Sequence, residues 1–147
     1  MSEREVEHNV VMVGVDGSPA SRLALRWAVR QAEAVSGRVV AVLAWQEPTG
    51  FGLGVTVPPG VQWGEEARVS LHSTVASALG ERVPVPIEQR VVEGHPAEVL
   101  LSQSKDADLL VVGSRGLGGF VGTLLGSVSR HVVSHASCPV VVIPDKT

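Results

Sequence analysis

The sequence has few cysteine, lysine and aromatic side chains, and each shortage excludes a class of protein. Its 147 residues include one cysteine, Cys138, so neither an intrachain disulfide framework nor a zinc site made only of cysteines can form. Three tryptophans, two phenylalanines and no tyrosine argue against a base-stacking platform for RNA or single-stranded DNA. Because lysine occurs only as Lys105 and Lys146, a bound anion would need arginine, hydroxyl groups or backbone N–H groups.

Long apolar runs and a strong charge of either sign are also missing. No stretch approaches the ~20 apolar residues that a membrane-spanning helix needs, and residues 1–9 are charged and polar, unlike a signal peptide. Twelve basic and fifteen acidic residues give a formal net charge of −3, which provides no broad attraction for nucleic acid or anionic lipid. We therefore expect a cytoplasmic protein without a nucleic-acid or membrane partner, and a single cysteine suits that reducing compartment.

The length suits one domain, and we find no internal repeat, charge block or linker. We expect residues 1–9 to form a disordered or flexible N-terminus and residues 10–147 to form the domain. Short β-branched runs alternate with segments of helical character, which predicts an α/β fold: an open parallel sheet with helices on both faces. The expected strands are Val10–Val15, Arg38–Trp45, Val85–Val92, Asp108–Val112 and Pro139–Ile143, and the expected helices are Pro19–Val35, Glu65–Leu79, Pro96–Ser104 and Ser127–Ala136.

The first helix carries its own boundary signals. Ser18 is a good N-cap residue and Gly37 is placed to end the helix. Leu23, Trp27 and Ala34 fall near helical spacing and predict its apolar face.

Two segments at the ends of expected strands carry the chemistry. Gly14–Ser18 lies at the end of the first strand, and a glycine-rich stretch, Gly113–Gly126, follows the fourth and leads into the helix at Ser127. Ligands of such sheets bind beyond the carboxyl ends of the strands. Glycines let a backbone approach an anion closely, a helix N-terminus attracts negative charge, and Ser127, Ser129 and Arg115 would add hydroxyl groups and a positive charge. The alternative is a flexible loop without a ligand, and the composition alone leaves both readings open.

Two familiar phosphate motifs do not occur here. A P-loop requires a lysine directly after its glycines, and none follows these. The dinucleotide fingerprint should follow the first strand, where the sequence has only Gly14-x-x-Gly17.

The spacing Gly113-x2-Gly116-x9-Gly126-Ser127 resembles the nucleotide-binding pattern of the universal stress protein family, in its ATP-binding type. The segments VVGSRGLGG, LLGSVS, HASCPVVVIP, VGVDGSPAS and EGHPAEVLL are also similar to that family, in its expected order. The resemblance extends from about Val10 to Pro144. Two departures stand out, which are Leu43 before the Ala-Trp pair and a long segment at Gln46–Gly60.

This resemblance implies a flavodoxin-like, five-stranded parallel sheet with strand order 3-2-1-4-5. It implies ATP bound across the carboxyl ends of strands one and four, with the backbone of Ala44 meeting adenine and Gly126–Ser129 holding the phosphates. It also implies a homodimer joined partly through the last strand, residues 139–143. With Arg115 added for its charge, the candidate ligand-binding residues are Gly14, Val15, Asp16, Ala44, Val112, Gly113, Arg115, Gly116, Gly126, Ser127, Val128 and Ser129.

The function that the resemblance implies is that of a stress-response sensor or regulator in which ATP orders residues 113–127. The alternatives are a slow ATPase and a dimeric interaction module without a nucleotide. No enzyme signature is present, so we expect at most weak hydrolysis. Asp16 would hold Mg²⁺ or Mn²⁺ on the nucleotide, or accept a ribose hydroxyl, or only form a turn with Gly17 and Ser18. The choice between AMP and ATP stays open.

Other residues have plainer interpretations. His131 and His135 share a helical face, but HVVSH brings no third ligand for zinc. Cys138 is expected to be a buried, unreactive thiol. Trp45 and Trp63 flank the Gln46–Gly60 segment, where they either cover a ligand or only pack that segment down.

Overall fold

The computed structural model describes residues 9–47, 60–116 and 125–145. The predictions for the N-terminus before Asn9, for positions 48–59 and for positions 117–124 lie outside the described residues. Within the described parts, no helix has the length and apolar character required to span a bilayer.

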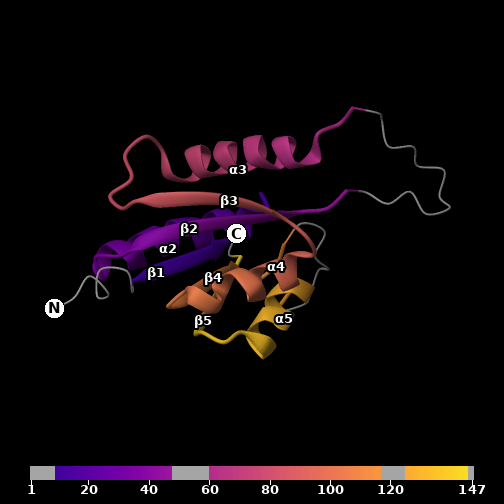
Figure 1. The fold of residues 1–147 in the computed structure, drawn as a ribbon. Helices are drawn as coiled ribbons and strands as arrows, with labels where there is room; N and C mark the ends of the chain where they lie inside the picture. Colours follow the sequence, from indigo (N-terminus) through magenta and orange to yellow (C-terminus); the bar gives the residue numbers. More distant parts are fainter. Residues whose placement is uncertain (1–8, 48–59, 117–124, 146–147) are drawn as a thin grey trace.

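Five parallel strands form one sheet in the order β3-β2-β1-β4-β5, with the first strand at its centre (Figure 1). This confirms the predicted α/β fold and strand order. β2 has the bounds expected from the sequence, and the other strands differ by one or two residues at their ends. The strands are β1 (Val10–Gly14), β2 (Arg38–Trp45), β3 (Ile87–Glu93), β4 (Leu109–Gly113) and β5 (Val140–Ile143).

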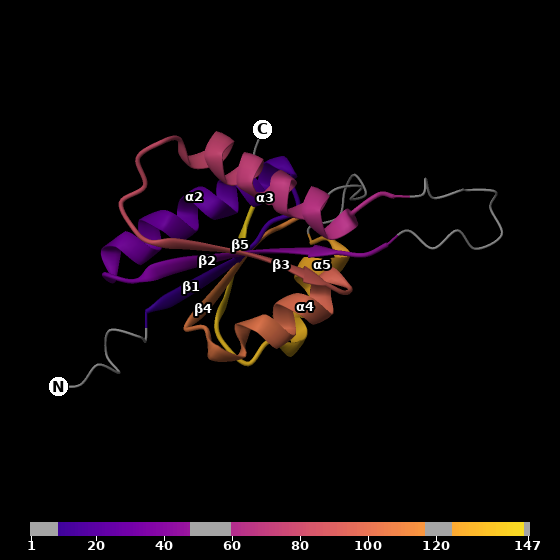
Figure 2. The same cartoon turned by 45° about the horizontal axis from the view of Figure 1, so that its top comes forward.

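Helices cover both faces of this sheet. Figure 2 shows α2 and α3 on one side of the strands and α4 and α5 on the other. Each helix ends at or within two residues of its predicted bounds, and the fourth segment tightens into a 3₁₀ turn at its end. The helical elements are α2 (Pro19–Ala34), α3 (Trp63–Leu79), α4 (Pro96–Gln103), η1 (Ser104–Asp106) and α5 (Ser127–His135).

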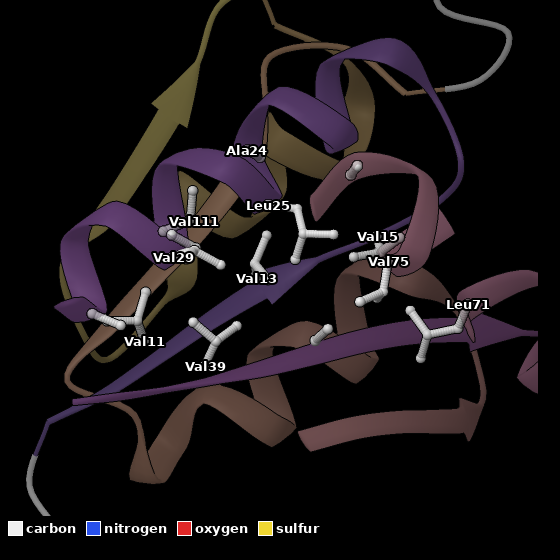
Figure 3. Close-up of a cluster of buried hydrophobic side chains, with 14 of the residues drawn as sticks. Val11, Val13, Val15, Ala24, Leu25, Val29, Val39, Leu71, Val75 and Val111 are labelled. Atoms are coloured by element: carbon white, nitrogen blue, oxygen red, sulfur yellow. The ribbon is translucent and has the colours of Figure 1, made fainter. Parts of the chain in front are cut away.

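Alternation along the strands divides the core into two clusters. Side chains of successive residues point to opposite faces of a sheet, so Val11 and Val13 pack beneath α2 and α3, whereas Val10 and Met12 pack toward α4 and α5. Figure 3 shows the first cluster, in which Leu25 of α2 meets the central strand. Because both faces are covered there, β1, β2 and β4 are almost entirely apolar rather than alternating, whereas the edge strand β3 carries Glu88, Gln89 and Arg90.

The apolar face of α2 is not the one predicted. Leu23 and Trp27 are only partly buried, and Ala34 is exposed. The helix instead turns a row of small residues to the sheet, because alanines spaced by four let its backbone lie close to the strands. The buried residues of α2 are Ala20, Ser21, Ala24, Leu25, Ala28, Val29 and Ala32.

The two residues predicted at the ends of α2 both take part in capping it. Ser18 is the N-cap, and its side chain accepts a hydrogen bond from the N–H of Ser21. At the other end, Ser36 rather than Gly37 takes the left-handed conformation, with φ 54°, and the N–H of Gly37 donates to the oxygen of Ala32 at 2.7 Å, which helps to end the helix as predicted. Glycine is also required at position 37 because a Cβ atom there would overlap the backbone oxygen of Asn9.

Candidate functional site

A cavity of about 490 Å³ opens at the carboxyl ends of β1 and β4. From β1 the strand order runs to β2 and β3 on one side and to β4 and β5 on the other, so the order reverses at this point. Ligands of open α/β sheets bind at such a reversal. All twelve residues named from the sequence line this cavity. It is also lined by residues that the sequence did not single out as ligand-binding, namely Ser18, Ser21, Val42, Pro96, Leu100, Leu125 and Arg130.

One end of the cavity is apolar. Val42 and Ala44 of β2, Leu100 of α4 and Val112 of β4 form its wall, and they belong to the core cluster beneath α4 and α5 or pack against it. Pro96, at the start of α4, completes the rim. This end has the chemistry of a slot for a flat, weakly polar group.

The backbone of Ala44 faces the cavity. Gly14 pairs with Val42, and the N–H of Val15 donates to the oxygen of Val42 at 2.9 Å. The backbone groups of residues two apart in a strand point the same way, so those of Ala44 also point toward β1. That strand ends at Gly14, which leaves the N–H and C=O of Ala44 without a strand partner among the described residues.

The opposite end of the cavity is the start of α5. Gly126 is the N-cap residue, in an extended conformation with φ −71° and ψ 172°, and it has no side chain to cap the helix. The first N–H groups of a helix have no intrahelical partner and carry partial positive charge. Ser127 and Val128 therefore present N–H groups toward the cavity that they line.

The hydroxyl of Ser129 has a structural role. Ser129 is 3% exposed, and its Oγ donates to the oxygen of Ser114 at 2.9 Å and lies 3.1 Å from the oxygen of Gly126. In this structure the group is directed to the protein's own backbone rather than into the cavity. The backbone N–H of Ser129 is what remains for a ligand.

Asp16 joins the two segments that the sequence singled out. Its Oδ1 accepts a hydrogen bond from the N–H of Ser18 at 2.9 Å, which forms the expected turn. Its other carboxylate oxygen lies so close to Gly116 that a Cβ atom there would overlap it. Glycine at position 116 thus allows the loops after β1 and β4 to touch.

Two arginines stand beside the start of α5. Arg115 reaches Asp145 with a nitrogen–oxygen distance of 3.5 Å, and both side chains keep some exposure. Arg130 donates to the oxygen of Leu125 at 3.4 Å and lines the cavity. Sequence reasoning missed Arg130, although its position four residues after Gly126 in the first turn of the helix was a usable signal.

The tryptophans do not contribute to the cavity wall. Trp45 packs against the core cluster beneath α2 and α3, and its ring lies against Gly64. Neither Trp45 nor Trp63 lines the cavity. Of the two interpretations, the structure supports packing for Trp45.

The histidines form no metal site in the described residues. His131 and His135 stack with ring centroids 4.5 Å apart, and His131 also lines a separate hollow of about 230 Å³ with His95 and Glu98. No group of three potential metal ligands occurs in the parts of the chain that the structure describes.

Cys138 is partly buried, and burial raises the pKa of its thiol above the ordinary value. The nearby charge of Asp108 raises the pKa further, and a hydrogen bond with Ser104 opposes this rise. Because the thiolate is the reactive form, we expect iodoacetamide to alkylate Cys138 more slowly at pH 8 in the folded chain than in guanidinium. The folded-state rate should approach the denatured rate only as the pH rises past the ordinary thiol range. Equal rates at pH 8 would contradict this prediction.

A model of the universal stress protein family matches residues 8–144, nearly the whole chain. The chain belongs to this family. The resemblance noted from the glycine spacing and its flanking segments is confirmed at the level of the family.

Curated relatives support the same assignment. Universal stress protein Rv2005c of Mycobacterium tuberculosis is 41% identical over 140 residues, which cover 92% of this chain and 45% of that protein. Rv2623 of the same organism is 38% identical over 141 residues, covering 92% of this chain and 48% of that protein. The chain therefore spans about half the length of these relatives.

Solved structures share the fold. UspA from Lactobacillus plantarum superposes with a TM-score of 0.72 at 21% identity and covers 93% of this chain and 98% of its own. A universal stress protein crystallised with cAMP has a TM-score of 0.68 at 28% identity, covering 94% and 98%. A relative from Archaeoglobus fulgidus, crystallised with dAMP, has a TM-score of 0.61 at 22% identity, covering 93% and 98%.

Proposed function

We propose that this universal stress protein chain binds an adenine nucleotide, ATP, in the 490 Å³ cavity and acts through it as a stress-response sensor or regulator. The observation that most supports this is the pairing of two unlike ends in one cavity. An apolar slot lies at one end and an uncapped helix N-terminus at the other. The complexes of two family members with cAMP and dAMP add support for the nucleotide class.

The apolar end suits adenine. The ring would lie between the side chains of Val42, Leu100 and Val112. The N–H and C=O of Ala44, which have no strand partner in the described part of the chain, would meet its edge. Adenine offers an acceptor, N1, beside a donor, the N6 amino group, which is the complement of one backbone N–H and one C=O. Guanine presents a donor and an acceptor in the opposite order, so ATP is expected to bind more tightly than GTP.

The start of α5 suits the phosphates. Phosphate oxygens would accept hydrogen bonds from the N–H groups of Ser127 and Val128 and from the hydroxyl of Ser127. Arg115 and Arg130 would supply the positive charge that a lysine supplies in a P-loop. The glycines at positions 116 and 126 keep this end clear of side chains.

A divalent cation fits only together with the nucleotide. Asp16 offers one carboxylate at the cavity, and the described residues contain no cluster of three ligands that would hold an ion alone. Mg²⁺ typically uses one or two carboxylates together with phosphate oxygens and water. Asp16 would therefore hold Mg²⁺ or Mn²⁺ against the phosphates.

A homodimer in the cytoplasm completes the proposal. β5 is an edge strand whose four residues are all partly exposed. An open strand edge with apolar side chains can pair with a second copy. The relatives of about twice this length are consistent with a unit that works in pairs.

The nucleotide released from the purified, denatured chain tests the proposal directly. Chromatography and mass spectrometry should identify an adenine nucleotide, and calorimetry of the nucleotide-free chain should give binding of ATP or AMP and weaker binding of GTP. Accumulation of ADP during incubation would identify a slow ATPase. A chain that neither retains a nucleotide nor binds ATP or AMP at millimolar concentration would refute the proposal and favour an interaction module without a nucleotide.

Replacing Arg115 with glutamine should weaken ATP binding by about 2- to 5-fold, which is the value of one partly exposed charge contact. Asp145→Asn should tighten binding, because it releases Arg115 from its carboxylate partner. Arg68→Gln is the matched control, since Arg68 pairs with Glu65 on α3 and does not line the cavity. Equal losses in the Arg115 and Arg68 variants would exclude a specific role for Arg115.

A further inference from the structure

Ser114 connects two parts of the molecule that meet only in the folded state. Its N–H donates to the oxygen of Ile143 at 2.8 Å, and its Oγ accepts from the N–H of Asp145 at 3.2 Å. Its backbone oxygen accepts from the N–H of Gly126 at 2.6 Å and from the hydroxyl of Ser129 at 2.9 Å. One residue thus holds both the carboxyl end of β5 and the first turn of α5.

The position of Ser114 separates it from direct ligand contact. Ser114 is 7% exposed and does not line the cavity, although its neighbours Gly113 and Arg115 do. Any effect of its side chain on a ligand must therefore pass through the residues that it holds. Buried hydrogen bonds of this kind keep one arrangement, because leaving a buried polar group without a partner is costly.

The bonds on the two sides of Ser114 lead to different surfaces. On one side, the oxygen of Gly126 accepts the N–H of Arg130 at 3.0 Å, which begins the helix that faces the cavity. On the other, Asp145 lies two residues after the end of β5, and β5 pairs with β4 on one edge and with no further strand of the described residues on the other. A change in the first turn of α5 and a change at the end of the edge strand are therefore linked by a single buried residue.

We infer that Ser114 is a positioning residue that couples the cavity to the carboxyl end of the edge strand β5. This inference rests on the proposed function, in which a nucleotide binds at the start of α5. Occupation of the cavity stabilises the first turn of α5 and, through Ser114, the segment Ile143–Asp145. Because coupling between two sites is reciprocal, a partner that stabilises this end of β5 tightens nucleotide binding. The end of β5 is thus the surface segment whose stability depends on whether the cavity holds a nucleotide.

Amide hydrogen exchange of the full chain, followed by NMR, tests the coupling first without a nucleotide. Ser114→Ala removes the oxygen that accepts from Asp145 and leaves the backbone bonds of Ser114 in place. It should speed exchange about tenfold at Asp145, as expected for the loss of one hydrogen bond, and by a smaller but measurable factor at Gly126. Ser114→Thr keeps the oxygen and should restore both rates. Ser134→Ala is the matched control, because it deletes an exposed hydroxyl that bonds within α5.

The second measurement adds ATP and keeps the two hypotheses distinct. In the unsubstituted chain ATP should slow exchange at both Gly126 and Asp145. In Ser114→Ala, ATP should slow exchange at Gly126 alone, and its affinity should be several-fold weaker. Faster exchange confined to Asp145 in the nucleotide-free variant, or unchanged protection of Asp145 by ATP, would overturn the coupling. If ATP does not bind the unsubstituted chain, the proposed function fails, and the nucleotide-free comparison at Gly126 still decides whether Ser114 links the two segments.

Discussion

Glutamate in place of Gly126 is expected to abolish ATP binding while the chain still folds. Gly126 has an extended conformation that any residue can adopt. A Cβ atom there would come within 3.4 Å of Cα of Arg115, an ordinary contact at its lower limit. A carboxylate at this position would lie at the positive end of α5, which stabilises it. It would therefore occupy the place where a phosphate group should bind.

The expected loss is about 100-fold or more, because two charge-assisted hydrogen bonds of ~1.5 kcal/mol each disappear and a like charge remains. Gly116→Glu should have a similar effect on binding, but it also forces a second carboxylate against Asp16. That substitution will therefore disturb the loops more than Gly126→Glu does.

Calorimetry with ATP, together with circular dichroism of each variant, separates these effects. Gly126→Ala is the matched control, since it adds the same Cβ atom without a charge and should bind ATP within a few-fold of the unsubstituted chain. Unchanged ATP affinity in both glutamate variants would show that the start of α5 does not hold the phosphates.

Alanine in place of Gly113 is expected to destabilise the fold itself. A Cβ atom at this position would lie 2.7 Å from Cβ of Ala20, 2.9 Å from its carbonyl carbon and 3.1 Å from its oxygen. Two of these atoms are backbone, so the crowding can be relieved only if α2 moves away from β4. Overpacking of this kind should lower the free energy of unfolding by about 2–3 kcal/mol. It should lower Tm by roughly 6–10 °C for a chain of this size.

Urea unfolding at 25 °C measures this loss, and a double variant identifies its cause. Ala20→Gly removes the Cβ–Cβ contact but not the backbone contacts, so Gly113→Ala with Ala20→Gly should recover part of the lost stability relative to the sum of the single changes. A Gly113→Ala chain that unfolds at the same urea concentration as the unsubstituted protein would show that α2 and β4 can separate without cost.

The architecture was readable from local patterns. The strands other than β3 are short, mostly apolar runs that suit burial on both faces. Helices α2 and α4 begin at a proline, and Ser18 caps the first of them. Right-handed crossovers then leave few arrangements of such a chain. The glycine spacing that ends in Gly126-Ser127 identified the family for a similar reason. A position where the backbone must approach another group closely requires glycine, and that requirement is visible in the sequence.

The face of α2 was predicted wrongly for a physical reason. Hydrophobic periodicity gives most weight to large side chains, so it predicts Leu23 and Trp27 on the buried face. Close packing instead selected small residues such as Ala24 and Ala28, which are fully buried. How near a helix lies to a sheet depends on the side chains opposite it, and these are distant in sequence.

The order of residues along the chain thus determined the elements, the family and the set of glycines and serines that surround the cavity. Only the tertiary structure decided what their polar groups do. The hydroxyl of Ser129 donates to the oxygen of Ser114, and among the described residues the backbone of Ala44 has no strand partner where β1 ends. The reason is that a hydrogen bond depends on strand register and on the approach of segments far apart in sequence, and no local pattern encodes either of these.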